Sequence, residues 1–187
     1  MDAVVIEQYI GDLMSKSTAE FPIWNIEKAR AGKKSGWDYI DGCMIMALLE
    51  IYSTSGDKKY LDFCDYYEDY RIRDDGTIDG YDKNTWNCDE LNGGKNLFVL
   101  YRYTNKEKYK KALDLLYEQV KGQPRTPEGN FWHKQIYPNQ VWLDGLYMAQ
   151  PFYMEYEKLF NNSKNIEDIE NKAFHTLKKS EKVNDAV

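Results

Sequence analysis

The chain has 187 residues, with 31 acidic and 25 basic side chains and a net charge of −6 at pH 7. This length is sufficient for one domain with a hydrophobic core. The acidic balance and the lack of a basic cluster argue against nucleic acid as a partner. No apolar run approaches the roughly 20 residues of a membrane span. Asp2 and Glu7 stand where a signal peptide would be positively charged, so we expect a cytoplasmic protein.

Aromatic residues make up 15% of the chain, which fits either a carbohydrate ligand or a helical core, and composition by itself favours the core. The three cysteines, Cys43, Cys64 and Cys88, are odd in number and lack metal-like spacing. We interpret them as reduced, mostly buried thiols. The two histidines, His133 and His175, are too few and too far apart for a zinc site.

Helical patterns dominate the sequence, and no convincing set of alternating strands is present. The first predicted helix covers about residues 2–16, and a loop follows over 17–36. Residues 38–54 are apolar almost all round, which predicts a helix that is buried on more than one side. Residues 57–70 are amphipathic, so that helix should bury a single face.

The pair of one apolar and one amphipathic helix then recurs. Residues 88–103 contain an apolar run, and residues 105–120 are amphipathic. Residues 142–160 are apolar again and include Pro151, which should kink the helix or mark a junction. A last amphipathic helix follows and fades into a polar tail.

A repeat with a period of 49 residues supports this alternation. Identical residues recur at that spacing in Trp37 and Trp86, Leu48 and Leu97, Tyr52 and Tyr101, Lys59 and Lys108, Tyr60 and Tyr109, and Asp65 and Asp114. A fixed period in this range indicates stacked helical hairpins. Inner helices that are contacted on both sides and outer helices that are contacted on one side describe an all-α toroid or α/α barrel. A tetratricopeptide solenoid, with its period of about 34, does not fit.

Two longer connections, residues 74–87 and 121–141, are rich in turn-forming and aromatic residues. The first resembles a calcium loop only superficially, because its carboxylates do not follow the required spacing. An ordinary turn is the favoured interpretation.

Each apolar helix begins with a Trp, an acid and a glycine. The three clusters are Trp37 with Asp38, Tyr39, Asp41 and Gly42; Trp86 with Asn87, Asp89 and Gly93; and Trp142 with Asp144 and Gly145. If the inner helices run the same way around a ring, Asp41, Asp89 and Asp144 converge on one pocket. The alternative is helix capping, which is worth roughly 0.5–2 kcal/mol for each acid.

Asp144 is the one carboxylate between Glu128 and Glu155, and its neighbours are apolar. A helix N-terminus favours its ionised form by up to about 1 kcal/mol. Full burial would raise its pKa by as much as roughly 3–5 units, and a nearby Asp89 would act in the same direction. In a dry pocket Asp144 would therefore be a proton donor. His133 is either packed on an aromatic ledge or a hydrogen-bonding group for substrate.

Residues 124–152 read PRTPEGNFWHKQIYPNQVWLDGLYMAQPF. This string resembles the signature of the unsaturated rhamnogalacturonyl hydrolases, glycoside hydrolase family 105. The resemblance extends back through WNCDELNGG and GDKKYL to WDYIDG and covers about residues 35–160.

The resemblance implies a six-hairpin (α/α)6 barrel that acts on pectin-derived oligosaccharides ending in a 4,5-unsaturated uronic acid. In such a reaction an acid protonates carbon 4, water adds at carbon 5, and the resulting hemiketal opens to release the neighbouring sugar. The resemblance implies no metal and no organic cofactor.

The match assigns Asp144 as proton donor and water activator and Asp89 as the second essential acid. The substrate-binding candidates are His133 and Tyr39, which match positions that contact the uronate ring, Trp142 and Met148 as pocket walls, and Asp41 and Trp132.

The resemblance fades after Phe160, whereas family members continue for about as many residues again. We therefore expect residues 1–160 to form a partial toroid of about three helical hairpins plus one extra helix, and residues 161–187 to form a terminal amphipathic helix with a polar tail. Such a chain should be weakly active or inactive alone, or should pair with a second chain or second half that completes the barrel.

Two rival functions remain open besides an oligosaccharide hydrolase. One is a non-catalytic carbohydrate-binding or interaction fragment. The other is a sugar epimerase on the same fold, which would need a pair of histidines as acid and base, and His133 is the one histidine near the motif.

Overall fold

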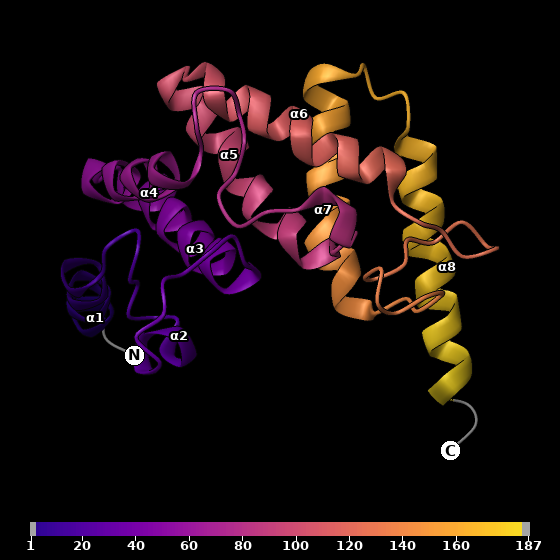
Figure 1. Cartoon of the computed structure of the whole chain (residues 1–187), viewed down its shortest axis with the longest axis horizontal. Coiled ribbons are helices and arrows are strands. Elements are labelled where there is room, and N and C mark those ends of the chain that lie inside the picture. Colours follow the sequence, from indigo (N-terminus) through magenta and orange to yellow (C-terminus); the bar gives the residue numbers. More distant parts are fainter. Residues whose placement is uncertain (1–2, 185–187) are drawn as a thin grey trace.

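The computed structural model describes residues 3–184, and the chain is helical throughout this range except for its connecting loops (Figure 1). The elements in chain order are α1 (Ala3–Lys16), α2 (Ile26–Arg30), α3 (Tyr39–Ser55), α4 (Lys58–Arg71), the short 3-10 helices η1 (Lys83–Thr85) and η2 (Cys88–Glu90), α5 (Leu91–Thr104), α6 (Glu107–Gly122), α7 (Leu143–Phe160) and α8 (Ile166–Asn184).

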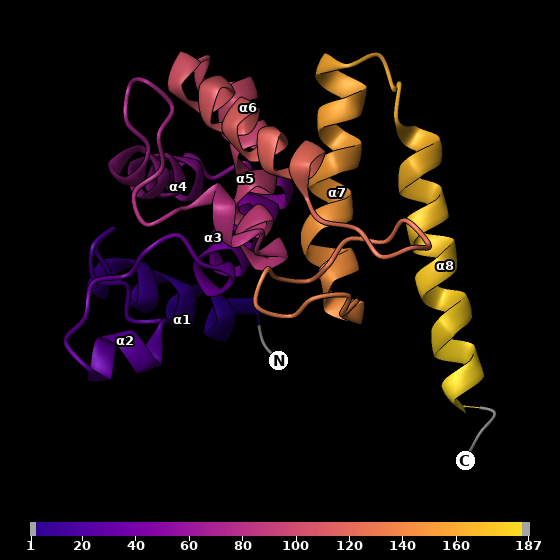
Figure 2. The ribbon, with the colours of Figure 1, turned by 45° about the vertical axis from the view of Figure 1, so that its right-hand side comes forward.

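The helices form consecutive hairpins. Helix α3 packs on α4, α5 on α6, and α7 on α8, while α3, α5 and α7 also pack on one another with α5 in the middle. Figure 2 shows α7 and α8 side by side at one end of the molecule and α1 at the other. Three hairpins and one additional long helix, α1, are thus present, and the predicted all-α partial toroid is confirmed.

The predicted helix positions agree with the observed ones, with three differences. Two short helices, α2 and η1, lie in segments that we expected to be loops throughout. Helix α8 continues to Asn184, whereas the sequence predicted a fading tail. The Lys and Glu residues of that stretch have good helix propensity, which explains the extension. The predicted tail residues 185–187 lie outside the described part of the chain.

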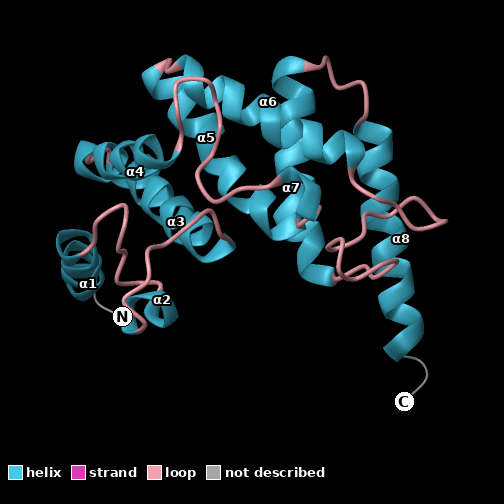
Figure 3. Ribbon diagram, viewed as in Figure 1, coloured by secondary structure: helices cyan, strands magenta, loops and turns pink. Residues whose placement is uncertain are grey.

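Side chains and left-handed residues fix where the helices begin and end. Asp38 accepts hydrogen bonds from the first amides of α3, and Asp57 does the same for α4. Gly56 and Asn105 close α3 and α5 in the left-handed conformation, which costs glycine nothing and asparagine little. Figure 3 shows these helices joined by loops, with no strand among the residues that are drawn in colour.

The core lies where α5 meets α6 and α7. Phe152 of α7 is fully buried and its ring lies 5.3 Å, centroid to centroid, from that of Phe98 of α5. Gly94 allows this approach, because a side-chain carbon there would come within 2.8 Å of the Phe152 ring. Helix α7 is continuous through Pro151, so that residue marks no junction between helices.

None of the described helices is both long enough and apolar enough to span a membrane.

Candidate active site

The loop between α6 and α7 is tied to η2, the short helix that precedes α5. The amide of Cys88 donates to the carbonyl of His133 at 2.9 Å, and the amide of His133 donates to the carbonyl of Gln140 at 2.8 Å. The side-chain nitrogen of Gln123 donates to the carbonyls of Trp86 and Trp132 at 2.6 and 2.8 Å. These bonds hold His133 against the start of α5.

Three chemically active side chains meet at this point. Asp89 comes from η2, His133 from the loop and Asp144 from the first turn of α7, and one ligating atom of each lies within 4.8 Å of the others. The sequence predicted that Asp89 and Asp144 share a rim, and the folded chain brings them together with the histidine.

Asp89 has a different partner on each oxygen. Its Oδ2 lies 2.7 Å from the ammonium nitrogen of Lys134, and its Oδ1 lies 3.4 Å from Nε2 of His133. Oδ1 is buried and forms no hydrogen bond with the described residues. The lysine balances the negative charge of Asp89, which leaves the second oxygen available to a substrate or water. No pattern in the sequence pointed to Lys134, although it follows His133 directly in the FWHK string.

His133 is 2% exposed, and burial lowers its pKa below the ordinary value of 6.5, although the charges of Asp89 and Asp144 act in the opposite direction. The imidazole is therefore neutral near pH 7. It stacks on Trp142 with ring centroids 4.3 Å apart and planes at 6°, and Tyr137 also stacks on Trp142, with ring centroids 5.3 Å apart. The predicted aromatic ledge is thus a stack of three rings.

Asp144 is not a helix cap. The residue at the N-cap position of α7 is Trp142, and it makes no side-chain capping bond. Asp144 lies in the first turn, where its side chain is exposed. The dry pocket in which Asp144 would act as a proton donor is therefore not formed by the described residues, which leave its side chain open to solvent.

Asp41 does not join the cluster. It is 4% exposed and accepts hydrogen bonds from Trp24 Nε1 at 2.7 Å and from the hydroxyl of Ser35. Arg71 lies 3.7 Å from it. Burial, followed by repulsion from Asp38, raises the pKa of Asp41. These contacts attach the segment after α1 to α3 and α4, so the predicted convergence holds for two of the three acids.

The other candidate residues lie in different environments. Tyr39, the first residue of α3, is 43% exposed, and its carbonyl accepts from the side chain of Asn92 at 3.1 Å. Trp142 is partly open to solvent, Met148 is buried one turn beyond Asp144, and Trp132 is half-buried. The roles that we predicted for these residues remain predictions.

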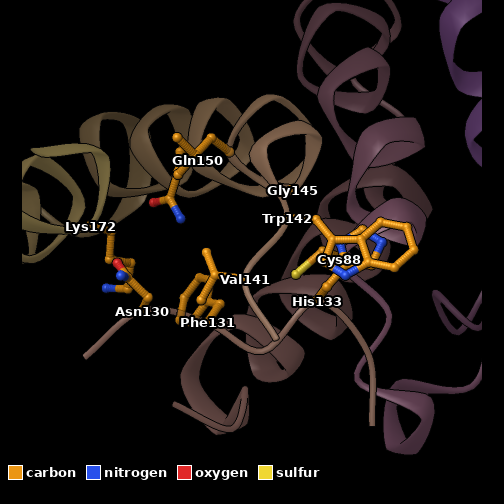
Figure 4. Close-up of a pocket in the computed structure, with 10 residues that line it drawn as sticks. Cys88, Asn130, Phe131, His133, Val141, Trp142, Gly145, Gln150 and Lys172 are labelled. Carbon is orange, nitrogen blue, oxygen red and sulfur yellow. The ribbon is translucent and has the colours of Figure 1, made fainter. Parts of the chain in front are cut away.

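A small, partly open cavity lies next to the stack, between the loop and the helices α7 and α8 (Figure 4). Its lining includes His133, Trp142 and Gly145 at one end and Asn130, Gln150 and Lys172 at the other. The side-chain amide of Asn130 is 1% exposed, and both of its polar atoms lack a hydrogen-bond partner among the described residues. No pattern in the sequence had pointed to Asn130 or Gln150.

Consecutive helical hairpins, with a carboxylate at the start of each of two adjacent inner helices and a histidine from a loop between them, fit an α/α-barrel glycoside hydrolase. The family model described as "Glycosyl Hydrolase Family 88" matches residues 6–185, and the chain belongs to this family. It is similar to a solved family 105 glycoside hydrolase from C. acetobutylicum ATCC 824, with 40% identity and a TM-score of 0.75. The predicted relationship to family 105 is confirmed.

That similarity covers 88% of this chain and 42% of the clostridial chain. The chain therefore spans less than half the length of the solved relative.

Proposed function

We propose that the chain carries the acid–base centre of a hydrolase for oligosaccharides that end in a 4,5-unsaturated uronic acid, such as those derived from rhamnogalacturonan. The observation that carries the proposal is the meeting of Asp89, His133 and Asp144 within 4.8 Å in a member of a glycoside hydrolase family.

In the proposed reaction the carboxyl group of Asp144 protonates carbon 4 of the vinyl ether, and its carboxylate then removes a proton from the water that adds at carbon 5. The hemiketal so formed opens and releases the neighbouring sugar. Because the anomeric carbon is not attacked, the spacing rule for the two carboxylates of ordinary glycosidases does not apply.

Asp89 would serve as the second acid, with its negative charge held near the reacting ring by Lys134. Trp142 is 40% exposed beside this cluster and offers aromatic surface that a sugar ring can contact. Neutral His133 can donate one hydrogen bond and accept another, which suits a ring that carries hydroxyl and carboxylate groups.

The exposure of Asp144 bears on how active the chain is. An acid that protonates carbon near neutral pH needs a raised pKa, and burial is the usual means of raising it. We propose that a second helical part covers this side of α7 in the active enzyme, and that the chain alone is weakly active or inactive.

The test is hydrolysis of an unsaturated rhamnogalacturonan disaccharide by the chain together with the part that covers α7, with loss of the double-bond absorbance as the readout. Asp144→Asn and Asp89→Asn should each lower turnover by at least about 10²-fold, as expected for a lost proton-transfer group. Asp79→Asn, on an exposed loop, is the matched control and should leave turnover unchanged.

A non-catalytic carbohydrate-binding role is the second candidate, and the exposed aromatic surface of Trp142 favours it. The two candidates differ in one measurement. If wild-type and Asp144→Asn proteins bind the disaccharide equally and neither converts it, even when the covering part is supplied, binding is the function.

A further inference from the structure

Helix α7 carries a proline in its interior. In an α-helix the carbonyl of each residue accepts the amide four residues later. Pro151 has no amide hydrogen, so the carbonyl of Tyr147 loses its partner within the helix. Such an unpaired carbonyl weakens the turn that lies directly after Asp144.

A side chain from the neighbouring inner helix reaches this carbonyl. The ammonium nitrogen of Lys95, in α5, lies 3.1 Å from the carbonyl oxygen of Tyr147. The same nitrogen lies 3.7 Å from the centre of the Tyr147 ring, within the range of a cation–π contact. One lysine thus contacts both the backbone and the side chain of Tyr147.

Tyr147 is also held from the third inner helix. Its hydroxyl donates to the sulfur of Met46, in α3, at 3.5 Å. Helices α3 and α5 therefore both contact the turn of α7 that follows Asp144, and the contact from α5 replaces the bond that Pro151 removes.

We infer that Lys95 is a positioning residue: it supplies from α5 the hydrogen bond that Pro151 takes from Tyr147, and so fixes the first turns of α7 and the direction of Asp144. The consequence for Asp144 rests on the proposed function, whereas the pairing of Lys95 with Pro151 does not.

A double-mutant cycle tests the pairing without any activity measurement. Lys95→Met removes the donor, and Pro151→Ala returns an amide to the Tyr147 carbonyl. A hydrogen bond from a charged donor is worth tenfold or more in an equilibrium constant, so Lys95→Met should raise the unfolding constant in urea by at least about tenfold when Pro151 is present.

In the Pro151→Ala protein the same change should raise the unfolding constant by about two- to fivefold, because only the cation–π contact is then lost. An equal effect of Lys95→Met in both backgrounds would overturn the inference.

Lys108→Met is the matched control. Lys108, in α6, also donates to a backbone carbonyl, that of Asp69 in α4, at 3.0 Å, but it has no relation to Pro151. Its effect should be the same in both backgrounds. Hydrogen exchange of residues 143–150 should speed up in Lys95→Met and not in Lys108→Met, and unchanged exchange in Lys95→Met would count against the inference.

The consequence for catalysis is tested by kinetics of the assembled enzyme on the unsaturated disaccharide. Lys95→Met should lower kcat about tenfold and leave KM within about twofold, and Lys95→Arg, which keeps a charged donor, should recover most of kcat. Pro151→Ala should restore the kcat of Lys95→Met. If the wild-type enzyme converts no substrate, the proposed function fails while the unfolding cycle still decides the pairing; if kcat is unaffected by Lys95→Met, the positioning role is refuted.

Discussion

At the scale of single residues, the site depends on how closely His133 is surrounded. Its imidazole lies between Trp142 and the first turn of α7, and the backbone of Gly145 faces Nδ1. A side-chain carbon at Gly145 would lie 3.2 Å from that nitrogen, which is tighter than most carbon contacts. The presence of glycine in the WLDG string therefore has a steric explanation: the missing side chain lets α7 approach the histidine.

Gly145→Ala tests this reason. A glycine replaced by alanine within a helix normally stabilises the protein by roughly 0.5–1 kcal/mol. We expect no such gain at Gly145, because the new methyl group must displace the imidazole, and the ring resonances of His133 should shift in NMR spectra. Gly11→Ala in α1, where nothing lies within 4 Å of the added carbon, is the control and should show the full gain. Equal gains at both positions would contradict the steric explanation.

His133 also predicts a dependence of stability on pH. Its pKa in the folded chain lies below 6.5 because of burial, so the unfolded chain takes up the proton first as pH falls. The stability that neutral His133 contributes is complete above pH 6.5 and is lost as pH falls through the lower folded pKa. In His133→Gln the free energy of unfolding should fall less between pH 7 and pH 5 than in the wild type. Parallel curves from urea titrations would contradict the prediction.

At the scale of elements, the N-terminal segment is held to the first hairpin by a buried polar network. Arg71 of α4 donates to the carbonyl of Ala19 at 2.6 Å and to the hydroxyl of Tyr67 at 2.8 Å, and it faces Asp41 of α3. Glu68, one turn earlier in α4, is buried beside it. Asp41 and Glu68 therefore share one arginine, so ionisation of one of the two carboxyl groups is stabilised only weakly.

Of the two acids in this network, Glu68 is the one whose negative charge can be removed. Burial raises its pKa to about 8, with Asp41 adding to the rise and Arg71 opposing it. The folded chain holds a proton that the unfolded chain releases above pH 4.5, so this group's contribution to stability falls as pH rises from 4.5 toward 8. Glu68→Gln should therefore match the wild type near pH 5 and be more stable at pH 8.

Arg71→Met provides the contrast. It leaves Asp41 buried without its cation and should cost about 3–5 kcal/mol, measured by urea unfolding at pH 7.

A Glu68→Gln protein that loses stability at pH 8 would show that the Glu68 charge is needed.

At the scale of the whole molecule, the described residues form three hairpins whose inner layer is open on one side. Large apolar side chains at the start of α7 are exposed, among them Leu143 at 60%. Tyr39 at the start of α3 is exposed as well. Exposed apolar residues at the starts of two inner helices are typical of a surface that another protein part covers.

We therefore predict that the chain binds a second set of helical hairpins through the inner ends of α3 and α7. Sedimentation of the chain with a fragment that supplies the remaining hairpins should show a complex, and Leu143→Ser should weaken it at least about tenfold. Val5→Ser, at an exposed position on α1 remote from this surface, is the control. A chain that remains separate at micromolar concentrations, or an equal effect of both changes, would argue against the prediction.

The sequence by itself determined the helices, their alternation and the family, because hydrophobic periodicity and a long local motif are written in neighbouring residues. It also identified Asp89, His133 and Asp144 as candidates, because they lie in the strings WNCDELNGG, FWHK and WLDG, respectively. Only the tertiary structure decided which acids meet: Asp41 and Asp89 each lie shortly after a tryptophan at the start of an apolar helix, but Trp24, Ser35 and Arg71 bury the first in a separate network. It also decided that Asp144 is exposed and that Lys95 meets Tyr147, because burial and contacts between distant residues depend on how whole helices pack.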